Sequence, residues 1–141
     1  MSEDVAARPV VLVVDVANVM GSRPDGWWRD RAGAASRLLA GLAPLRGRTL
    51  PGPDGAAVAP LRLVRVCAVV EGRARDVPAP AGLELVRAPR DGDASIARAA
   101  EDVVAAGEVP LVVTADRGLR ARLPAGAEVA GPRWLLDLMP G

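Results

Sequence analysis

The stretch VVLVVDVANVMGSRPDGWW, residues 10–28, decides the fold. Five apolar residues in a row predict a strand over residues 10–15 that is buried on both faces, as strands of parallel sheets are. The run ends at Asp15. A carboxylate directly after such a strand is partly desolvated, so we favour a functional Asp15 over a structural one.

Helical and strand patterns alternate after this strand. Apolar spacing of three and four predicts a helix from Trp27 to Leu42, with Asp25 as its N-cap and an inner face formed by Trp28, Ala32, Ala35, Leu39 and Leu42. Residues 44–60 are rich in Pro and Gly and predict a mobile surface loop, a candidate lid. Further strands are predicted at 61–72, 83–88, 109–116 and 127–131, and further helices at 91–107, 117–123 and 132–139.

This order of elements is typical of an α/β domain with a mainly parallel sheet, here of four to five strands. At 141 residues, half of them apolar, the chain is long enough for one domain, with a core from about residue 10 to 139. The Gly-rich phosphate motifs GxGxxG and GxxxxGK[ST] do not occur in the sequence.

Missing residue types narrow the function. The chain has no His and one Cys, Cys67, inside an apolar run. This excludes Ser-His-Asp and Cys-His catalysis, His-ligated metal sites and a disulfide within the chain. The net charge of +1 favours no class of partner, although the basic residues are all Arg, which binds phosphate well when clustered.

The N-terminal segment is acidic and does not resemble a signal peptide. No apolar run approaches the roughly 18 residues of a membrane span. We therefore expect a cytoplasmic protein that does not bind membranes.

Carboxylates follow the predicted strands. Asp15, Glu71 and Asp116 close strands, and Asp91 and Asp93 lie between a strand and a helix. Ligands of open α/β sheets bind beyond the carboxyl ends of the strands. Two unit charges about 4 Å apart repel by roughly 4 kcal/mol at an effective dielectric constant near 20, so we expect a bound cation. Mg²⁺ or Mn²⁺ suits an oxygen-only site, and the lack of His and Cys ligands argues against zinc.

Each carboxylate also has a structural interpretation. Asp93 and Asp116 precede helical patterns, so N-capping explains them as well as catalysis does. For Asp15 capping is the weaker explanation, because the VAN that follows does not start a convincing helix. Glu71 and Asp91 are flanked by Gly and Arg, which favours solvated loops for both.

Three stretches resemble the acidic motifs of the NYN family in the PIN-like nuclease superfamily: VVDVAN, DASIARAAED and VVTADRGLRARL. The resemblance spans about residues 10 to 139. It implies a Rossmann-like three-layer α/β/α sandwich whose acidic cluster binds a divalent metal and cleaves RNA. In the middle motif relatives often carry two adjacent acids, whereas here Gly92 separates Asp91 from Asp93. The number of metal ions therefore stays open.

The resemblance implies that Asp15, Asp93 and Asp116 hold Mg²⁺ or Mn²⁺ and serve as catalytic residues. Asn18 is the fourth catalytic candidate. It either bridges the loop by a side-chain hydrogen bond or positions a phosphate or a water molecule.

Substrate contacts are expected from both ends of the chain, at Thr114, Arg117, Arg23 and Trp27. By the resemblance, Arg117 holds a phosphate, and Thr114 supports the last carboxylate through its hydroxyl. Trp27, with Arg23 and neighbouring arginines, could stack a base, or it packs against the Pro-rich loop. Trp28 belongs to the inward helical face and is expected in the core.

The leading hypothesis is a metal-dependent ribonuclease that hydrolyses RNA phosphodiesters, with arginines stabilising the developing negative charge. Two alternatives stay open. One is a noncatalytic RNA-binding or adaptor domain with a degenerate site, and the other is a nucleotide phosphohydrolase, which a Rossmann-like edge also supports.

Overall fold

The computed structural model describes residues 6–23, 26–54 and 59–139, and in these residues six strands form one sheet. The elements are β1 (Arg8–Asp15), α1 (Val16–Gly21), η1 (Trp27–Arg29), α2 (Arg31–Leu42), η2 (Ala43–Leu45), β2 (Thr49–Leu50), β3 (Leu61–Val70), η3 (Gly72–Ala74), β4 (Glu84–Arg87), α3 (Gly92–Ala105), β5 (Pro110–Val113), α4 (Arg117–Arg122), β6 (Glu128–Ala130) and α5 (Pro132–Leu138), where η denotes a 3₁₀ turn. The strand order is β2-β3-β1-β5-β6, and β4 also pairs with β3.

The central strand is β1, which runs parallel to β3 on one side and to β5 on the other. The chain leaves β1 toward β3 and β4, and α3 then carries it back to β5 on the opposite side of β1. The strand order therefore reverses at β1. Its carboxyl end is the point where open α/β sheets bind their ligands.

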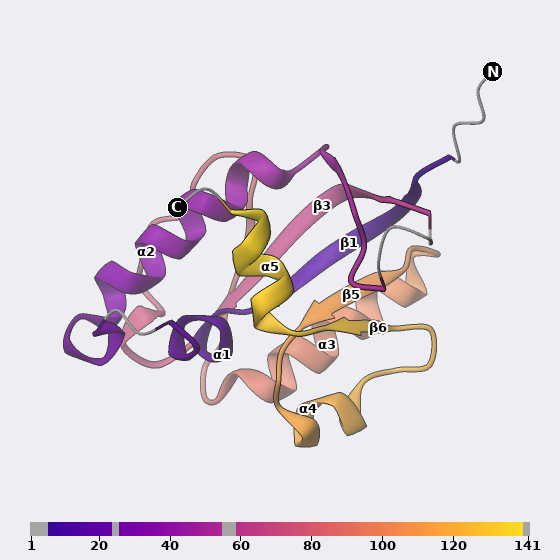
Figure 1. Cartoon of the computed structure of the whole chain (residues 1–141). Helices are drawn as coiled ribbons and strands as arrows, with labels where there is room; N and C mark the ends of the chain where they lie inside the picture. The colour runs from indigo at the N-terminus through magenta and orange to yellow at the C-terminus, as the bar shows by residue number, and fades with distance from the viewer. Residues whose placement is uncertain (1–5, 24–25, 55–58, 140–141) are drawn as a thin grey trace.

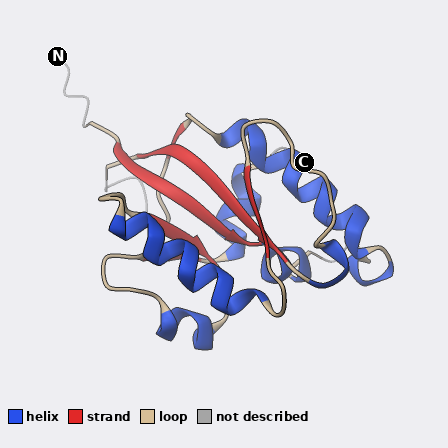
Figure 2. Ribbon diagram, turned by 180° about the vertical axis from the view of Figure 1, so that it is seen from behind, coloured by secondary structure: helices blue, strands red, loops and turns tan. Residues whose placement is uncertain are grey.

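Helices cover both faces of the sheet, as Figures 1 and 2 show from opposite sides. Val10, Leu12 and Val14 of β1 face the core beneath α1, α2 and α5, whereas Val11 and Val13 face the core beneath α3 and α4. A strand buried on both faces has no need of alternating polar residues, which explains the continuous apolar run. The predicted three-layer α/β/α sandwich with a mainly parallel sheet is confirmed.

The predicted helix over residues 27–42 is wrong in its first turn. Residues 27–29 form the 3₁₀ turn η1, and α2 starts at Arg31 behind Asp30, whose side chain accepts a hydrogen bond from Gly33 N at 3.0 Å. A Cβ at Gly33 would displace this capping carboxylate, because an ideal Cβ there would lie 2.2 Å from Asp30 Oδ2. The predicted cap, Asp25, lies outside the described residues.

This change of element reverses the predicted roles of the two tryptophans. Gly26 enters η1 with φ +74°, a left-handed conformation that glycine adopts freely, so the helical periodicity does not extend back to this turn. Trp28 is 55% exposed and lies outside the core, whereas Trp27 is half-buried against it. Ala32, also expected inward, is exposed.

The predicted mobile loop over residues 44–60 is largely structured in its described part. β2 pairs antiparallel with the start of β3, matching Leu50 with Leu61. Leu63 of β3 donates from its N to Arg48 O at 2.9 Å and accepts from Gly47 N at 2.6 Å. This extra strand also brings the sheet above the four to five strands predicted.

The remaining helices follow the prediction closely. Asp91 caps α3, and Gly107, with φ +82°, follows its end, within two residues of the predicted bounds 91–107. Pro132 opens α5. None of the helices in residues 6–23, 26–54 and 59–139 is long and apolar enough to cross a membrane.

Candidate acidic site

The carboxyl ends of β1, β3 and β5 meet at one edge of the sheet. Asp15, the last residue of β1, lies opposite Val69 of β3, and Val14 lies opposite Val113 of β5. This register brings Asp15 level with Thr114, the residue after β5. Chain segments about a hundred residues apart therefore meet at this edge.

Asp15 caps a helix that the sequence did not suggest. The VAN after it opens α1, and Asn18 N donates to Asp15 Oδ1 at 3.3 Å. The prediction that no helix begins there was wrong. The other oxygen, Oδ2, accepts a hydrogen bond from Thr114 Oγ1 at 2.9 Å, so the capping role uses only half of a carboxylate that is 7% exposed.

Thr114 holds Asp15 and Asp116 in place. Asp116 N donates to Thr114 Oγ1 at 3.1 Å. Because a backbone N–H can only donate, the hydroxyl oxygen accepts there and its proton is directed at Asp15. Thr114 is fully buried, and its hydroxyl contacts both Asp15 and the backbone of Asp116; its role at the substrate stays a prediction.

Asn18 clamps the two loops of the site together. Its Oδ1 accepts from Ala115 N at 2.8 Å, across 97 positions of sequence. The bridging alternative for Asn18 is therefore present, although it joins two distant loops. Because the oxygen faces a donor, the half-buried amide NH₂ is turned elsewhere, and it has no hydrogen-bond partner among the described side chains and backbone.

Asp116 caps α4 by accepting from Leu119 N at 3.0 Å, as one of the two interpretations predicted. The carboxylate is exposed, as is Arg117 beside it. Arg120, which sequence reasoning missed, donates from Nη2 to Thr114 O at 2.8 Å and braces the same loop. Its only sequence signal is its spacing of one helical turn from Asp116.

The start of α3 supplies further carboxylates. The cap is Asp91, which accepts from Asp93 N at 3.0 Å, so the Asp93 carboxylate is not used for capping. Glu71 follows β3 and is half-buried, contrary to the solvated loop expected for it, and in the described structure its buried Oε2 has no hydrogen-bond partner. Gly92 permits this approach, because an ideal Cβ there would lie 3.2 Å from Glu71 Oε2.

Burial and nearby negative charge raise the pKa of Asp15 and of Asp93. Burial raises the pKa of Asp15 most, the Thr114 and Asn18 hydrogen bonds lower it, and the charges of Asp93 and Asp116 raise it further. Burial likewise raises the pKa of Asp93, with Asp116 and Asp91 adding to the rise and Arg122 opposing it.

The pKa of Glu71 is raised as well. Burial is the largest cause of the raised pKa of Glu71, and the carboxylates of Asp15, Asp91 and Asp93 raise it further. No ion pair with an arginine joins any of these groups in the described residues.

The donor chemistry suits a hard divalent cation. Every candidate ligand is an oxygen, and one buried carboxylate oxygen lacks a partner. In the described part of the chain, however, no three His, Cys, Asp or Glu side chains are grouped closely enough to hold one ion. The arrangement fits the way Mg²⁺ is often bound, by one or two carboxylates with water molecules completing the shell.

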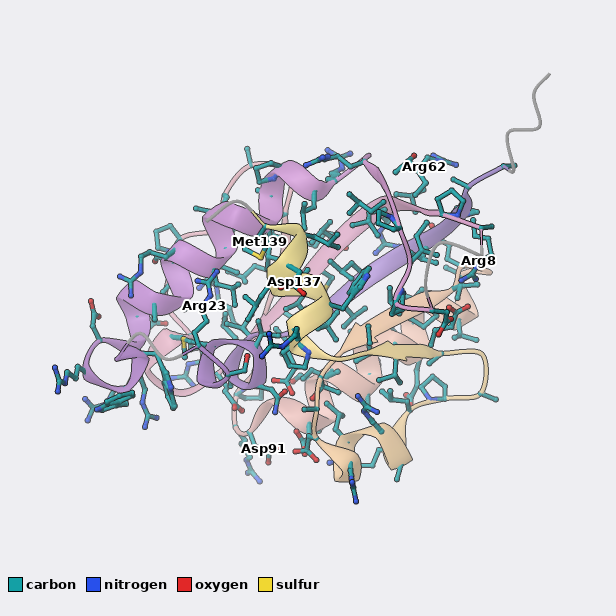
Figure 3. The ribbon with its side chains drawn as sticks, viewed as in Figure 1. Arg8, Arg23, Arg62, Asp91, Asp137 and Met139 are labelled. Carbon is teal, nitrogen blue, oxygen red and sulfur yellow. The ribbon has the colours of Figure 1, made fainter. Side chains whose placement is uncertain are left out.

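A cleft of about 360 Å³ adjoins the acidic edge. It is lined by Ala17, Met20, Trp27, Arg31, Glu71, Gly72, Arg73, Ala74, Arg90 and Asp91. Trp27 therefore does lie near the carboxylates. Arg23, predicted to act with it, instead lines a separate recess with Arg133 and Asp137 of α5; Figure 3 labels Arg23 and Asp137.

The fold is similar to that of Rae1 (YacP) from Bacillus subtilis, in the crystal structure of one of its mutants. The TM-score is 0.63 at 19% sequence identity, over 92% of this chain and 74% of that one. No family model matches the chain, and a search of curated proteins finds no match. At this identity the similarity shows the fold.

Proposed function

We propose that the chain is a divalent-metal-dependent ribonuclease. One observation carries the proposal: Asp15 is a buried carboxylate at the point where the strand order reverses, it is held by Thr114 and Asn18, and it forms no ion pair with an arginine among the described residues. A protein that desolvates a carboxylate without a counter-charge in this position has use for a cation. The three motifs that resemble those of the NYN family, and the fold shared with Rae1, support the same function.

One or two of Asp15, Asp93 and Asp116 would hold Mg²⁺ or Mn²⁺ directly, with water molecules completing the shell, because no three carboxylates of the described residues are close enough to share one ion. Such an ion, when bound, polarises a phosphodiester and makes a water molecule more acidic. The charges of Asp93 and Asp116 both act on Asp15, so a cation near it relieves repulsion at all three.

The remaining residues position the substrate and keep the site rigid. The Asn18 NH₂ is available to donate to a phosphate oxygen, and Arg117, exposed beside Asp116, is placed to hold another. Arg120 and Thr114 fix the β5–α4 loop. Small displacements of catalytic groups cost large factors in rate, which is why such bracing matters.

A noncatalytic RNA-binding domain is the second candidate. It is favoured by the absence of a preformed three-carboxylate group in the described residues and by Gly92 between Asp91 and Asp93.

Thermal unfolding during Mn²⁺ or Mg²⁺ titration tests the proposed cation. The midpoint of the wild-type chain should rise, because a ligand at a hundred times its Kd stabilises the folded state by about 2.7 kcal/mol. Asp15→Asn should abolish the rise, whereas Asp137→Asn, an exposed change on α5, should leave it intact. A wild-type midpoint insensitive to either metal would favour the noncatalytic domain.

Cleavage assays separate the enzyme classes. Labelled single-stranded RNA and nucleoside triphosphates are incubated with the chain, with and without chelator. We expect metal-dependent RNA cleavage that Asp15→Asn lowers by about a hundredfold or more, since even changes to groups that support metal ligands cost about 10- to 100-fold. Hydrolysis of the triphosphates alone would point instead to a phosphohydrolase.

A further inference from the structure

Trp28 is the exposed large apolar side chain of the described structure, at 55% exposure. Its ring meets that of Trp27 edge-on, with the ring centroids 6.2 Å apart. Trp27 is itself seated on the core and lies against α1, where an ideal Cβ on Gly21 would be 3.6 Å from its ring. One tryptophan is thus anchored and supports the other, whose ring is open to solvent.

A cleft of about 480 Å³ lies beside this ring. It is lined by Trp28, Arg29, Asp30, Arg31, Ala32 and Arg73. The Asp30 carboxylate already caps α2 through Gly33 N. None of the three arginines forms an ion pair with another described residue, so the cleft carries uncompensated positive charge.

The guanidinium groups are placed near the rings. The Arg29 carbon Cζ lies 5.8 Å from the Trp28 centroid, and the Arg31 Cζ lies 5.3 Å from the Trp27 centroid. Aromatic rings that stack bases, next to cations that bind the backbone, are the recurring elements of single-strand recognition.

The Trp28 cleft borders a second cleft at the acidic edge of the sheet. Arg31 and Arg73 line both this cleft and the smaller one that contains Glu71 and Asp91. A polyanion approaching the carboxylates would be repelled by them, and a row of arginines beside them offsets that repulsion. The two shared arginines therefore link the Trp28 cleft to the cleft that contains Glu71 and Asp91.

We propose that the Trp28 cleft binds one nucleotide of a single-stranded RNA outside the acidic site. The base stacks on the face of Trp28 that Arg29 does not cover, and the adjoining phosphates bind Arg31 and Arg73. The choice of RNA rests on the proposed function, whereas the stacking site does not depend on catalysis. A single strand is required because a paired base cannot present its face to the ring.

The test is equilibrium binding of a fluorescein-labelled single-stranded RNA, measured by anisotropy in the presence of chelator so that no metal-dependent cleavage occurs. Trp28→Ala should weaken binding by roughly five- to a hundredfold, the usual loss when a stacking aromatic is removed. Trp28→Phe should restore most of the affinity. The same RNA in a duplex should compete at least about tenfold less well.

Arg73→Gln should weaken binding and reduce the slope of log K against log salt by about 0.7, the value for one phosphate contact on a single strand. Arg62→Gln is the matched control. Arg62 is exposed and lies near the start of β3, far from Asp91 in Figure 3, so its loss should change affinity far less. Because Trp28 is exposed, Trp28→Ala should keep the wild-type unfolding midpoint, which separates lost binding from misfolding.

Unchanged affinity in Trp28→Ala, equal competition by duplex RNA, or absence of RNA binding by the wild-type chain would each overturn the Trp28 cleft. These results are distinct from the cleavage assay. If the chain cleaves RNA but binds it equally well without Trp28, the proposed ribonuclease function holds and the proposed Trp28 site is wrong. If binding depends on Trp28 but no RNA is cleaved, the Trp28 site holds and the ribonuclease function is wrong.

Discussion

Carboxylates at the two ends of the sheet have opposite environments. Near the amino ends of the parallel strands, Arg8 pairs with Glu128 at 2.8 Å, and Arg65 pairs with both Glu84 and Glu108. Hydrogen bonds from Arg65 lower the pKa of Glu84, and those from Arg8 lower the pKa of Glu128. Glu84, Glu108 and Glu128 each have a counter-charge.

At the carboxyl ends, burial and like charge raise the pKa of Asp15, Glu71 and Asp93, and the described residues supply no arginine ion pair. Arginines thus form ion pairs with the carboxylates at the amino ends of the strands, and in the described residues they form none with Asp15, Glu71 or Asp93. Leaving charges unpaired lowers stability, so this difference is what we expect if the unpaired end binds a cation, as proposed above.

Removing the Thr114 hydroxyl should have the largest effect. Thr114→Val leaves Asp116 N–H and one Asp15 oxygen without partners in a buried place, which should cost about 1–3 kcal/mol of stability. RNA cleavage should fall by about 10- to 100-fold, as when a group that orients metal ligands is lost. Denaturant unfolding and cleavage rates measure both. As a control, Thr114→Ser keeps the hydroxyl and should have nearly the stability and cleavage rate of the wild type. If Thr114→Val also behaves like the wild type, Thr114 does not support the site.

The stability of variants at the two ends of the sheet should depend on pH in opposite ways. Measured in chelator, Glu71→Gln and Glu84→Gln should each match wild type only at a pH low enough to protonate the replaced carboxyl in both the folded and the unfolded state, which for Glu84 lies below its lowered folded pKa. As pH rises, ionised Glu71 destabilises the folded state because its folded pKa is raised, so Glu71→Gln should become more stable than wild type.

Glu84→Gln should move in the opposite direction. Its folded pKa is lowered, so the wild type gains stability above the unfolded pKa and loses it as pH falls through the folded one. The variant should therefore unfold at a lower temperature than wild type at pH 7. Thermal unfolding midpoints measured between pH 4 and 7 test both predictions. If the midpoints of the two variants change with pH in the same way relative to wild type, the proposed difference between the two ends of the sheet is wrong.

Breaking the Arg8–Glu128 pair should have the smallest effect. Both side chains are more than a third exposed, and such pairs contribute about 0–1 kcal/mol. Arg8→Gln should leave RNA cleavage unchanged and shift the unfolding midpoint by at most a few degrees. A large loss of cleavage would show that the paired end of the sheet also serves the site.

The sequence predicts the layers of the fold because burial on both faces leaves a strong signal. The continuous apolar residues of β1 and the Gly-bounded pattern of α3 both appear where expected. The start of α2 was misplaced because alanine fits either face of a helix, so periodicity alone could not show that Asp30 ends the preceding turn. The exposure of Trp28 follows from that boundary.

For the candidate site, the sequence identifies the residues better than their partners. The carboxylates stand out because they end apolar strands. The hydrogen bonds from Thr114 to Asp15 and from Ala115 to Asn18 join positions 99 and 97 residues apart, and only the register of β1 with β5 brings them together. Arg120 was missed for a different reason: its partner, Thr114 O, is only six residues away, and the bond depends on the conformation of the β5–α4 loop.

The short strands at the rim of the sheet have a consequence for handling the protein. One side of β3 is shared between β2, of two residues, and β4, of four, and the opposite rim is β6, of three. Short edges offer little template for strand addition between molecules. The uncharged Val and Leu segment of β1 has the composition of aggregation-prone strands. It lies in the middle of the sheet, where only unfolding would expose it to self-association.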